Sequence, residues 1–136
     1  MENLQHIKQT NLPITFKREK HYELYFRKTR DERYLMIIIQ TTIGSEEDAR
    51  ELTNYLVKKQ LIACGTFTKI QSIYKWEEEI QQESEYEINL YSKESLHDQL
   101  IETLKEKHTY ELPKITSIKP TYTLPEYDDW VNKETI

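Results

Sequence analysis

The sequence predicts an α+β fold in which strand, helix, strand, strand, helix and strand follow one another, with a short helix at the end. Three features lead to this prediction: an isoleucine-rich run near residue 37, two helical stripes of apolar residues, and two long extended segments between those stripes. The length of 136 residues fits a single domain.

The first strand and the first helix are predicted within residues 35–59. Residues 35–41 form a continuous apolar run rich in isoleucine, as expected of a strand that is covered on both faces. Gly44 ends the run, and Ser45 begins a capping-box-like helix start with acids in the first turn. One helical stripe follows and ends near Lys59; it consists of Ala49, Leu52, Leu56 and Val57.

Two long strands are predicted next, at residues 62–76 and 79–91. The first is dense in threonine, isoleucine and aromatic residues and contains no proline. In the second, Tyr86, Ile88 and Leu90 alternate with a polar set made of Glu83, Glu85, Glu87 and Asn89. The connection lacks the Asn-Gly or Gly-Gly pair of a tight turn, so a wider loop is predicted there.

The second helix, the fourth strand and the final helix are predicted after residue 91. The helical stripe is Leu96, Leu100, Ile101 and Leu104. Either Ser95 with Asp98, or Ser92, is placed to cap this helix. Pro113 blocks its continuation, a short strand covers residues 114–119, and a brief helix over 126–131 follows Pro125 with Tyr127 and Trp130 on one face.

This order of elements is the ferredoxin-like βαββαβ arrangement, here with a long hairpin between the second and third strands. Right-handed crossovers place both longer helices on one face of the sheet and leave the other face open. A monomer of this size cannot cover that face together with so long a hairpin. We therefore expect self-association, with hairpins pairing between subunits.

The N-terminal residues 1–33 are predicted to be a basic extension, partly disordered, that precedes a domain at residues 34–136. Residues 1–35 hold eight Lys and Arg against five Asp and Glu, whereas the remainder holds eleven against nineteen. One interpretation is a nucleic-acid-binding arm, and the other is a solvated extension that includes a short strand around residues 21–26. The mixed charges favour the solvated extension, so nucleic acid is not an expected partner.

Several classes of protein are not expected. No run of 18 apolar residues is present, so no membrane span is predicted. A single cysteine cannot form an internal disulfide, which favours a reducing, cytoplasmic location. The sequence has no G-x-S-x-G motif, no phosphate-binding loop and no dinucleotide-binding glycine pattern. We therefore expect a protein that is not an enzyme.

Several motifs together resemble the CutA divalent-cation-tolerance family over residues 35–133. They are Leu61-Ile62-Ala63-Cys64, Ile73-Tyr74-Lys75-Trp76-Glu77, the segment from Tyr86 to Lys93, and His108-Thr109-Tyr110-Glu111-Leu112-Pro113. Glu78 stands where the family usually has glycine, and Gly65-Thr66 replace an apolar residue and asparagine. The resemblance implies a homotrimer, similar in architecture to PII signalling proteins, with a role in divalent metal ion tolerance.

Cys64 and His108 are the candidate metal ligands, because a soft sulfur and an imidazole suit copper or zinc. The alternative is that Cys64 is a small buried apolar residue. No C-x-x-C, H-x-x-x-H or H-E-x-x-H motif supplies the clustered ligands of a preformed site. Lys93 and His108 flank the second helix at opposite ends, so only a neighbouring subunit can bring them together.

The resemblance also implies an intersubunit cleft, with Lys93, Tyr110 and Pro113 contributing and with Tyr74 and Trp76 from the hairpin. An equally good interpretation is that these aromatic residues, together with Tyr122 and Trp130, pack at an interface. The acidic strand face is either a site for hard cations or, as we favour, a solvated surface.

The leading hypothesis is thus a CutA-like homotrimer, not an enzyme, that binds divalent cations of the copper type or a small ligand at intersubunit clefts. No cofactor is obligatory in this hypothesis, and copper or zinc is the optional metal. The alternative is a PII-like trimeric signalling or scaffold module that acts through a partner protein.

Overall fold

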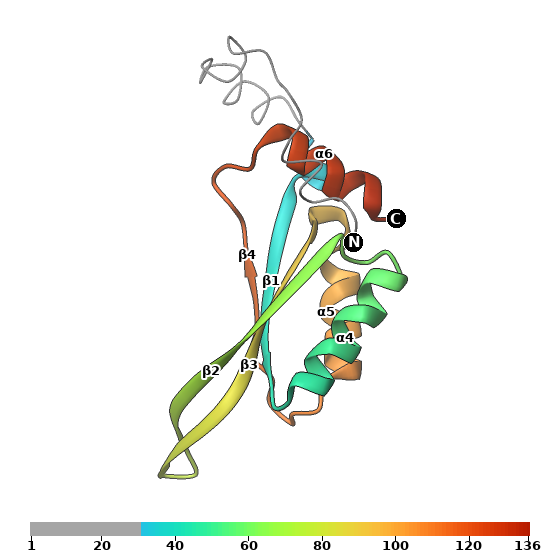
Figure 1. Cartoon of the computed structure of the whole chain (residues 1–136). Helices are drawn as coiled ribbons and strands as arrows, with labels where there is room; N and C mark the ends of the chain where they lie inside the picture. The colour runs from blue at the N-terminus through green and yellow to red at the C-terminus, as the bar shows by residue number, and fades with distance from the viewer. Residues whose placement is uncertain (1–30) are drawn as a thin grey trace.

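The computed structural model describes residues 31–136 and contains one four-stranded antiparallel sheet (Figure 1). Its strands are β1 (Met36–Ile43), β2 (Cys64–Trp76), β3 (Glu79–Lys93) and β4 (Ile115–Ile118). They lie in the order β2-β3-β1-β4, and every neighbouring pair is antiparallel. The predicted α+β class is confirmed, whereas the strand that we considered around residues 21–26 lies outside the described residues.

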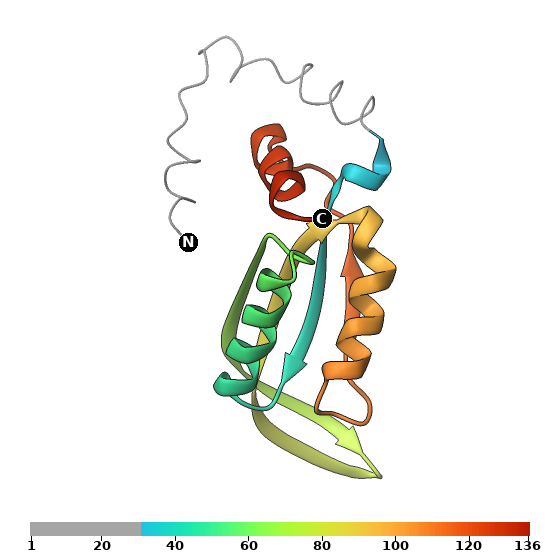
Figure 2. The same ribbon diagram turned by 90° about the vertical axis from the view of Figure 1, so that its right-hand side faces the viewer.

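Two helices cover one face of this sheet. Figure 2 shows α4 (Glu46–Lys58) and α5 (His97–Lys107) side by side on that face. Helix α6 (Pro125–Glu134) lies at the end of the sheet where β1 begins and is longer than predicted (Figure 1). Short 3₁₀ turns, η1 (Glu32–Tyr34) and η2 (Glu94–Leu96), precede β1 and α5. Within residues 31–136, every helix is too short or too polar to be a membrane span.

The two helix starts differ in how well the sequence predicted them. Ser45 is the N-cap of α4, and its hydroxyl accepts a hydrogen bond from the Asp48 backbone N–H at 3.1 Å. The predicted serine cap of α5 is wrong, because the N-cap is Leu96 and no side chain caps it. Ser95 lies within η2, and the buried Ser92 hydroxyl instead donates to the Leu61 carbonyl at 2.7 Å. A buried hydroxyl needs a partner, and the chain entering β2 supplies it.

The main core lies between the sheet and the two helices. Fully buried residues from β1, β3, α4 and α5 meet there, among them Ile39, Ile88, Leu56 and Leu100. Helix α4 approaches β2 closely at Gly65, where an added Cβ would lie only 2.5 Å from the Thr53 Cγ2. Glycine at this position therefore permits the observed packing distance between helix and strand.

A second, smaller cluster joins α6 to the other face of the sheet. Met36 alternates with the core residue Ile37 along β1, so its side chain faces away from α4 and α5. There it packs with Val131 of α6. Tyr127 and Trp130 contact the same cluster, in agreement with the prediction that they share one face of the helix. Asp128 accepts a buried hydrogen bond from the Met36 N–H at 2.8 Å. Helix α6 thus covers one end of the face that the sequence predicted to be open.

The β2–β3 hairpin ends in a two-residue turn, and the predicted wider loop is wrong. Trp76 pairs with Glu79, which leaves only Glu77 and Glu78 between the strands. Their φ angles are 48° and 69°. Positive φ at both central residues is the requirement of the type I′ turn, which suits the twist of a hairpin. Side chains other than glycine lose about 1–2 kcal/mol per residue in this conformation, and the long ladder of the hairpin offsets that cost.

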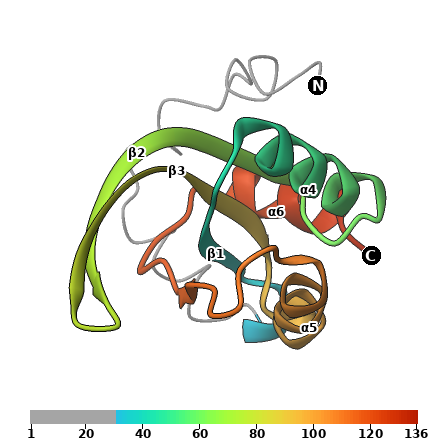
Figure 3. The same ribbon diagram turned by 90° about the horizontal axis from the view of Figure 1, so that it is seen from below.

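The outer part of the hairpin extends beyond the rest of the sheet. The pairing of β1 with β3 ends at Ile43 and Tyr86, so the residues of β3 before Tyr86 pair only with β2. Figure 3 shows this outer part curving away from α4 and α5. A two-stranded ribbon by itself is marginally stable. This part of the hairpin therefore depends on contacts with other segments.

Candidate functional site

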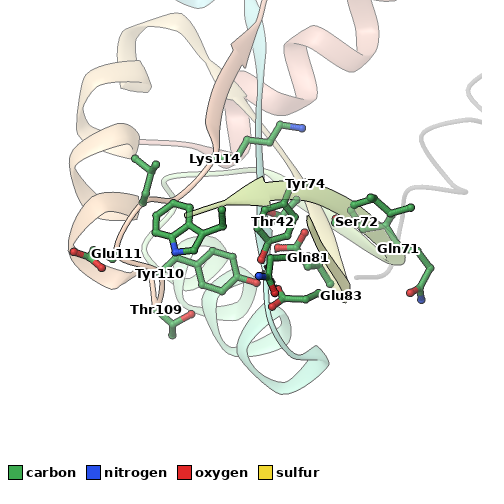
Figure 4. Close-up of a pocket in the computed structure, with 15 residues that line it drawn as sticks. Thr42, Gln71, Ser72, Tyr74, Gln81, Glu83, Thr109, Tyr110, Glu111 and Lys114 are labelled. Atoms are coloured by element: carbon green, nitrogen blue, oxygen red, sulfur yellow. Dashed lines mark hydrogen bonds between the residues drawn. The ribbon is translucent and has the colours of Figure 1, made fainter. Parts of the chain in front are cut away.

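A cavity of about 1000 Å³ lies between the outer hairpin and the segment that joins α5 to β4 (Figure 4). Residues of the outer part of β2, including Tyr74 and Trp76, line it together with Glu83 and Glu85 of β3. Tyr110, from the segment after α5, closes the opposite side. The cavity thus combines aromatic side chains with carboxylates from segments that are distant in the sequence.

Glu85 is the most buried acidic side chain of this cavity, with only 7% of its surface exposed. The hydroxyl of Tyr110 donates a hydrogen bond of 2.8 Å to Glu85 Oε1. Burial, and then the Glu85 carboxylate, raise the pKa of Tyr110 far above its ordinary value of 10. The hydroxyl therefore keeps its proton and acts as a hydrogen-bond donor to the carboxylate.

A second tyrosine–glutamate pair lies beside the first. The hydroxyl of Tyr74 donates to Glu83 Oε2 at 2.8 Å, and this hydrogen bond raises the pKa of Tyr74. Glu83 and Glu85 are two residues apart on β3 and so point to the same face. In the close-up, Tyr74, Tyr110 and Glu83 point toward one another (Figure 4).

The carboxylates of the cavity have no positively charged protein partner in the described part of the chain. No Lys or Arg of residues 31–136 forms an ion pair with Glu83 or Glu85. Lys114, which also lines the cavity, donates instead to the amide oxygen of Gln40 at 2.8 Å. A buried carboxylate without a counter-charge is costly, so the cavity favours a cationic occupant.

His108 anchors the segment that carries Tyr110. The Tyr110 backbone N–H donates to His108 Nδ1 at 3.0 Å, so the proton of the neutral ring is on Nε2. Nε2 in turn donates to the Thr42 carbonyl at 2.8 Å, and the Thr41 hydroxyl lies 3.1 Å away. Burial lowers the pKa of His108, which favours this neutral form. Both ring nitrogens are engaged, so binding of a metal ion by His108 would require the ring to give up one of these hydrogen bonds.

Cys64 lies at the other end of the sheet from His108. Cys64 is buried at the start of β2, where it pairs with Tyr91 of β3, and Tyr91 in turn pairs with Ile38 of β1. His108 instead contacts β1 at Thr42. Four residues along a strand correspond to about 13 Å. Within residues 31–136 of one subunit, no group of three His, Cys, Asp or Glu side chains is placed to hold a metal ion. A metal ion shared by Cys64 and His108 would therefore require two subunits.

The remaining predicted cleft residues divide between the same two ends. Tyr74, Trp76 and Tyr110 line the cavity, and Pro113 lies between two of its lining residues. Lys93 is buried and pairs with Met36, at the Cys64 end of the sheet. Trp130 and Tyr122 do not line the cavity. Trp130 packs in the α6 cluster.

Sequence reasoning missed Glu85, because the alternation of β3 assigned it to a solvated face. The alternation itself is confirmed: Ile88 and Leu90 are in the core and Glu83 is exposed. Glu85 is buried because Tyr110 reaches over it from a segment 25 residues further along the chain. Strand periodicity contains no signal of that contact.

The family of the chain follows from comparison with known proteins. A family model, described as CutA1 divalent ion tolerance protein, matches residues 37–134. The chain belongs to this family. The match includes α4, α5 and α6 and all four strands of the described sheet except the first residue of β1, so the CutA resemblance seen in the motifs is confirmed.

Individual CutA proteins agree with this assignment. The divalent-cation tolerance protein CutA of Thermotoga maritima is 35% identical over 101 residues, which are 74% of this chain and 100% of that protein. A crystal structure of Pyrococcus horikoshii CutA superposes with a TM-score of 0.72 at 33% identity and covers 74% of this chain and 99% of that one. A relative from Arabidopsis thaliana, 28% identical over 73% of this chain and 55% of that protein, is described as chloroplastic. A CutA of Archaeoglobus fulgidus is described as periplasmic, so CutA proteins are described in more than one compartment.

Proposed function

We propose that the chain is a ferredoxin-like CutA subunit that assembles as a homotrimer and contributes to divalent metal ion tolerance by binding a divalent cation or a small ligand in clefts between subunits. The observation that supports binding most directly is the cavity beside Glu85, a buried carboxylate that lacks a positively charged partner in the described residues. In this proposal the protein binds and does not catalyse, and its compartment is the cytoplasm.

Exposed apolar side chains of the outer hairpin support the trimer. Ile73 and Ile80 are 70% and 73% exposed, and Trp76 is 44% exposed. Apolar groups gathered on a protruding ribbon are typical of a surface that another subunit covers. A mass near three times 16.5 kDa by light scattering is expected. A stable monomer would remove both the trimer and the intersubunit cleft.

Two sets of donors are available for a cation. Cys64 with an imidazole from another subunit would suit copper or zinc, whereas Glu83 and Glu85 offer oxygen ligands to a harder cation. Titration calorimetry with copper and zinc salts tests the first set in wild type, Cys64→Ser and His108→Ala. Unchanged isotherms in both variants would exclude these ligands. Glu85→Gln, which keeps the size of the side chain, tests the second set with manganese and magnesium.

The protruding hairpin also supports a second candidate, a PII-like signalling or scaffold module that acts through a partner protein. The turn presents Glu77 and Glu78, and the apolar side chain of Ile80 is exposed beside them. A pull-down with the full chain, with a form lacking residues 1–33 and with Ile80→Thr tests this candidate. A partner captured equally well by all three forms would contradict a role for either surface.

A further inference from the structure

The cavity has room for an organic molecule. About 1000 Å³ is at the upper end of the range for small-molecule sites and far exceeds the space of one coordinated ion. Apolar lining from Ile70 and Leu112 lies beside the polar groups. An organic occupant would therefore meet apolar groups as well as charged ones.

The charge of the cavity selects a cation. Glu85 is more than nine-tenths buried, accepts its hydrogen bond from an uncharged hydroxyl and has no ion pair with residues 31–136. Glu83 and Glu111 add negative charge to the lining, and the lysine of the lining donates to Gln40. A ligand ammonium group that donates to Glu85 would compensate the buried charge and form a charge-assisted hydrogen bond.

The lining favours an organic ammonium ion over a metal ion. Tyr74, Trp76 and Tyr110 provide aromatic faces, which attract ammonium groups and pack against methylene groups. The tyrosine hydroxyls donate to the carboxylates, so they do not present oxygen anions to a metal. The described lining contains no cysteine or histidine.

The spacing of the two carboxylates indicates two ammonium groups. Glu83 and Glu85 lie on the same face of β3, two residues apart, which corresponds to about 6.5–7 Å along the strand. We propose that the cavity binds a short linear diamine or polyamine, with one ammonium group on Glu85, a second on Glu83 and the methylene chain against Trp76 and Tyr110. This inference deepens the proposed binding function and rests on it.

Titration calorimetry of the full chain with putrescine and spermidine tests the inference. Both are expected to bind. Weaker binding is expected for 1-aminobutane, which lacks one of the two ammonium groups, and for 1,4-butanediol, which lacks both. Glu85→Gln is expected to weaken putrescine binding about tenfold or more, since a charge-assisted hydrogen bond is lost. Glu87→Gln is the matched control: it lies two residues further on the same face of β3 but does not line the cavity.

Equal weakening by Glu85→Gln and Glu87→Gln would overturn the inference, because it would indicate nonspecific attraction to an acidic surface. Absence of heat with both amines would overturn it as well. Trp76→Leu, at an exposed position of the hairpin, keeps the test valid if Glu85→Gln fails to fold; it is expected to weaken amine binding.

The same titrations separate this inference from the proposed function. Binding of a divalent cation without binding of either amine would leave the proposed function standing and refute the diamine site. Amine binding by a chain that is monomeric in light scattering would support the diamine site and refute the intersubunit cleft.

Discussion

Gly65→Ala tests how closely α4 packs on β2. A methyl group at this position would lie 2.5 Å from Thr53 Cγ2, 3.3 Å from Ile62 Cδ1 and 3.4 Å from Leu90 Cδ2. Carbon atoms pack best at about 3.5–4.0 Å, so the gap to Thr53 must widen by about 1 Å. Thr53 cannot simply turn away, because its hydroxyl donates to the Ala49 carbonyl at 2.7 Å. We expect the free energy of unfolding to fall by about 1–3 kcal/mol, as for other overpacked cores.

The matched control for this substitution is Gly44→Ala. The nearest atom to an added methyl group there is Tyr110 Oη, at an ordinary contact distance of 3.5 Å, and Gly44 does not have a positive φ. Alanine reduces the entropy of the unfolded chain, so Gly44→Ala is expected to be neutral or to stabilise by up to about 1 kcal/mol. The difference between the two variants isolates the steric contact.

Chemical denaturation at one fixed protomer concentration measures these changes, since assembly makes stability depend on concentration. Adding Thr53→Ser to Gly65→Ala removes Cγ2 and keeps the hydroxyl. The double variant is expected to recover about 1 kcal/mol relative to the sum of the single changes. A Gly65→Ala chain as stable as Gly44→Ala, or a coupling energy near zero, would refute the argument from close packing.

Three further substitutions or conditions test other features. Replacing Glu77 and Glu78 by Asn and Gly suits their positive φ angles and is expected to raise the free energy of unfolding by about 1–2 kcal/mol; a loss of stability would contradict the primed turn. Asp128→Ala leaves the buried Met36 N–H without its acceptor and is expected to cost about 1–3 kcal/mol in urea denaturation, whereas an unchanged midpoint would argue against that hydrogen bond. Folding lowers the pKa of His108 below 6.5, so the unfolded chain binds more protons than the folded chain as the pH falls through 6.5. The free energy of unfolding of wild type, relative to that of His108→Gln, should therefore decrease as the pH falls. A constant difference in the free energy of unfolding between pH 7.5 and 5 would contradict this prediction.

The described strands and helices illustrate what local patterns are able to predict. The apolar stripe after Ser45 and its acidic first turn predicted α4 together with its cap, because both signals lie within a few residues of one another. The alternation of Ile88 and Leu90 with polar residues predicted the buried face of β3. The motifs from Leu61 to Pro113 predicted the CutA family, whose model then matched.

The candidate site was less predictable, because its residues meet through contacts between distant segments. Tyr74, Trp76 and Tyr110 were expected in a cleft between subunits, and within one subunit they line one cavity. Cys64 was expected to work with His108, but the pairing of β2 with β3 and β1 places it at the other end of the sheet.

The sequence by itself therefore determined the order of the elements and the core-facing side of the two longer helices and of β3, since these depend on periodicities of two and 3.6 residues that are local to each segment. Only the tertiary structure decided the fate of individual polar groups. Glu77 and Glu78 adopt positive φ because the ladder of the hairpin sets its register, and Glu85 is buried because Tyr110 reaches across it. The environment of a polar side chain depends on which distant segment packs over it, and that is a property of the assembled chain.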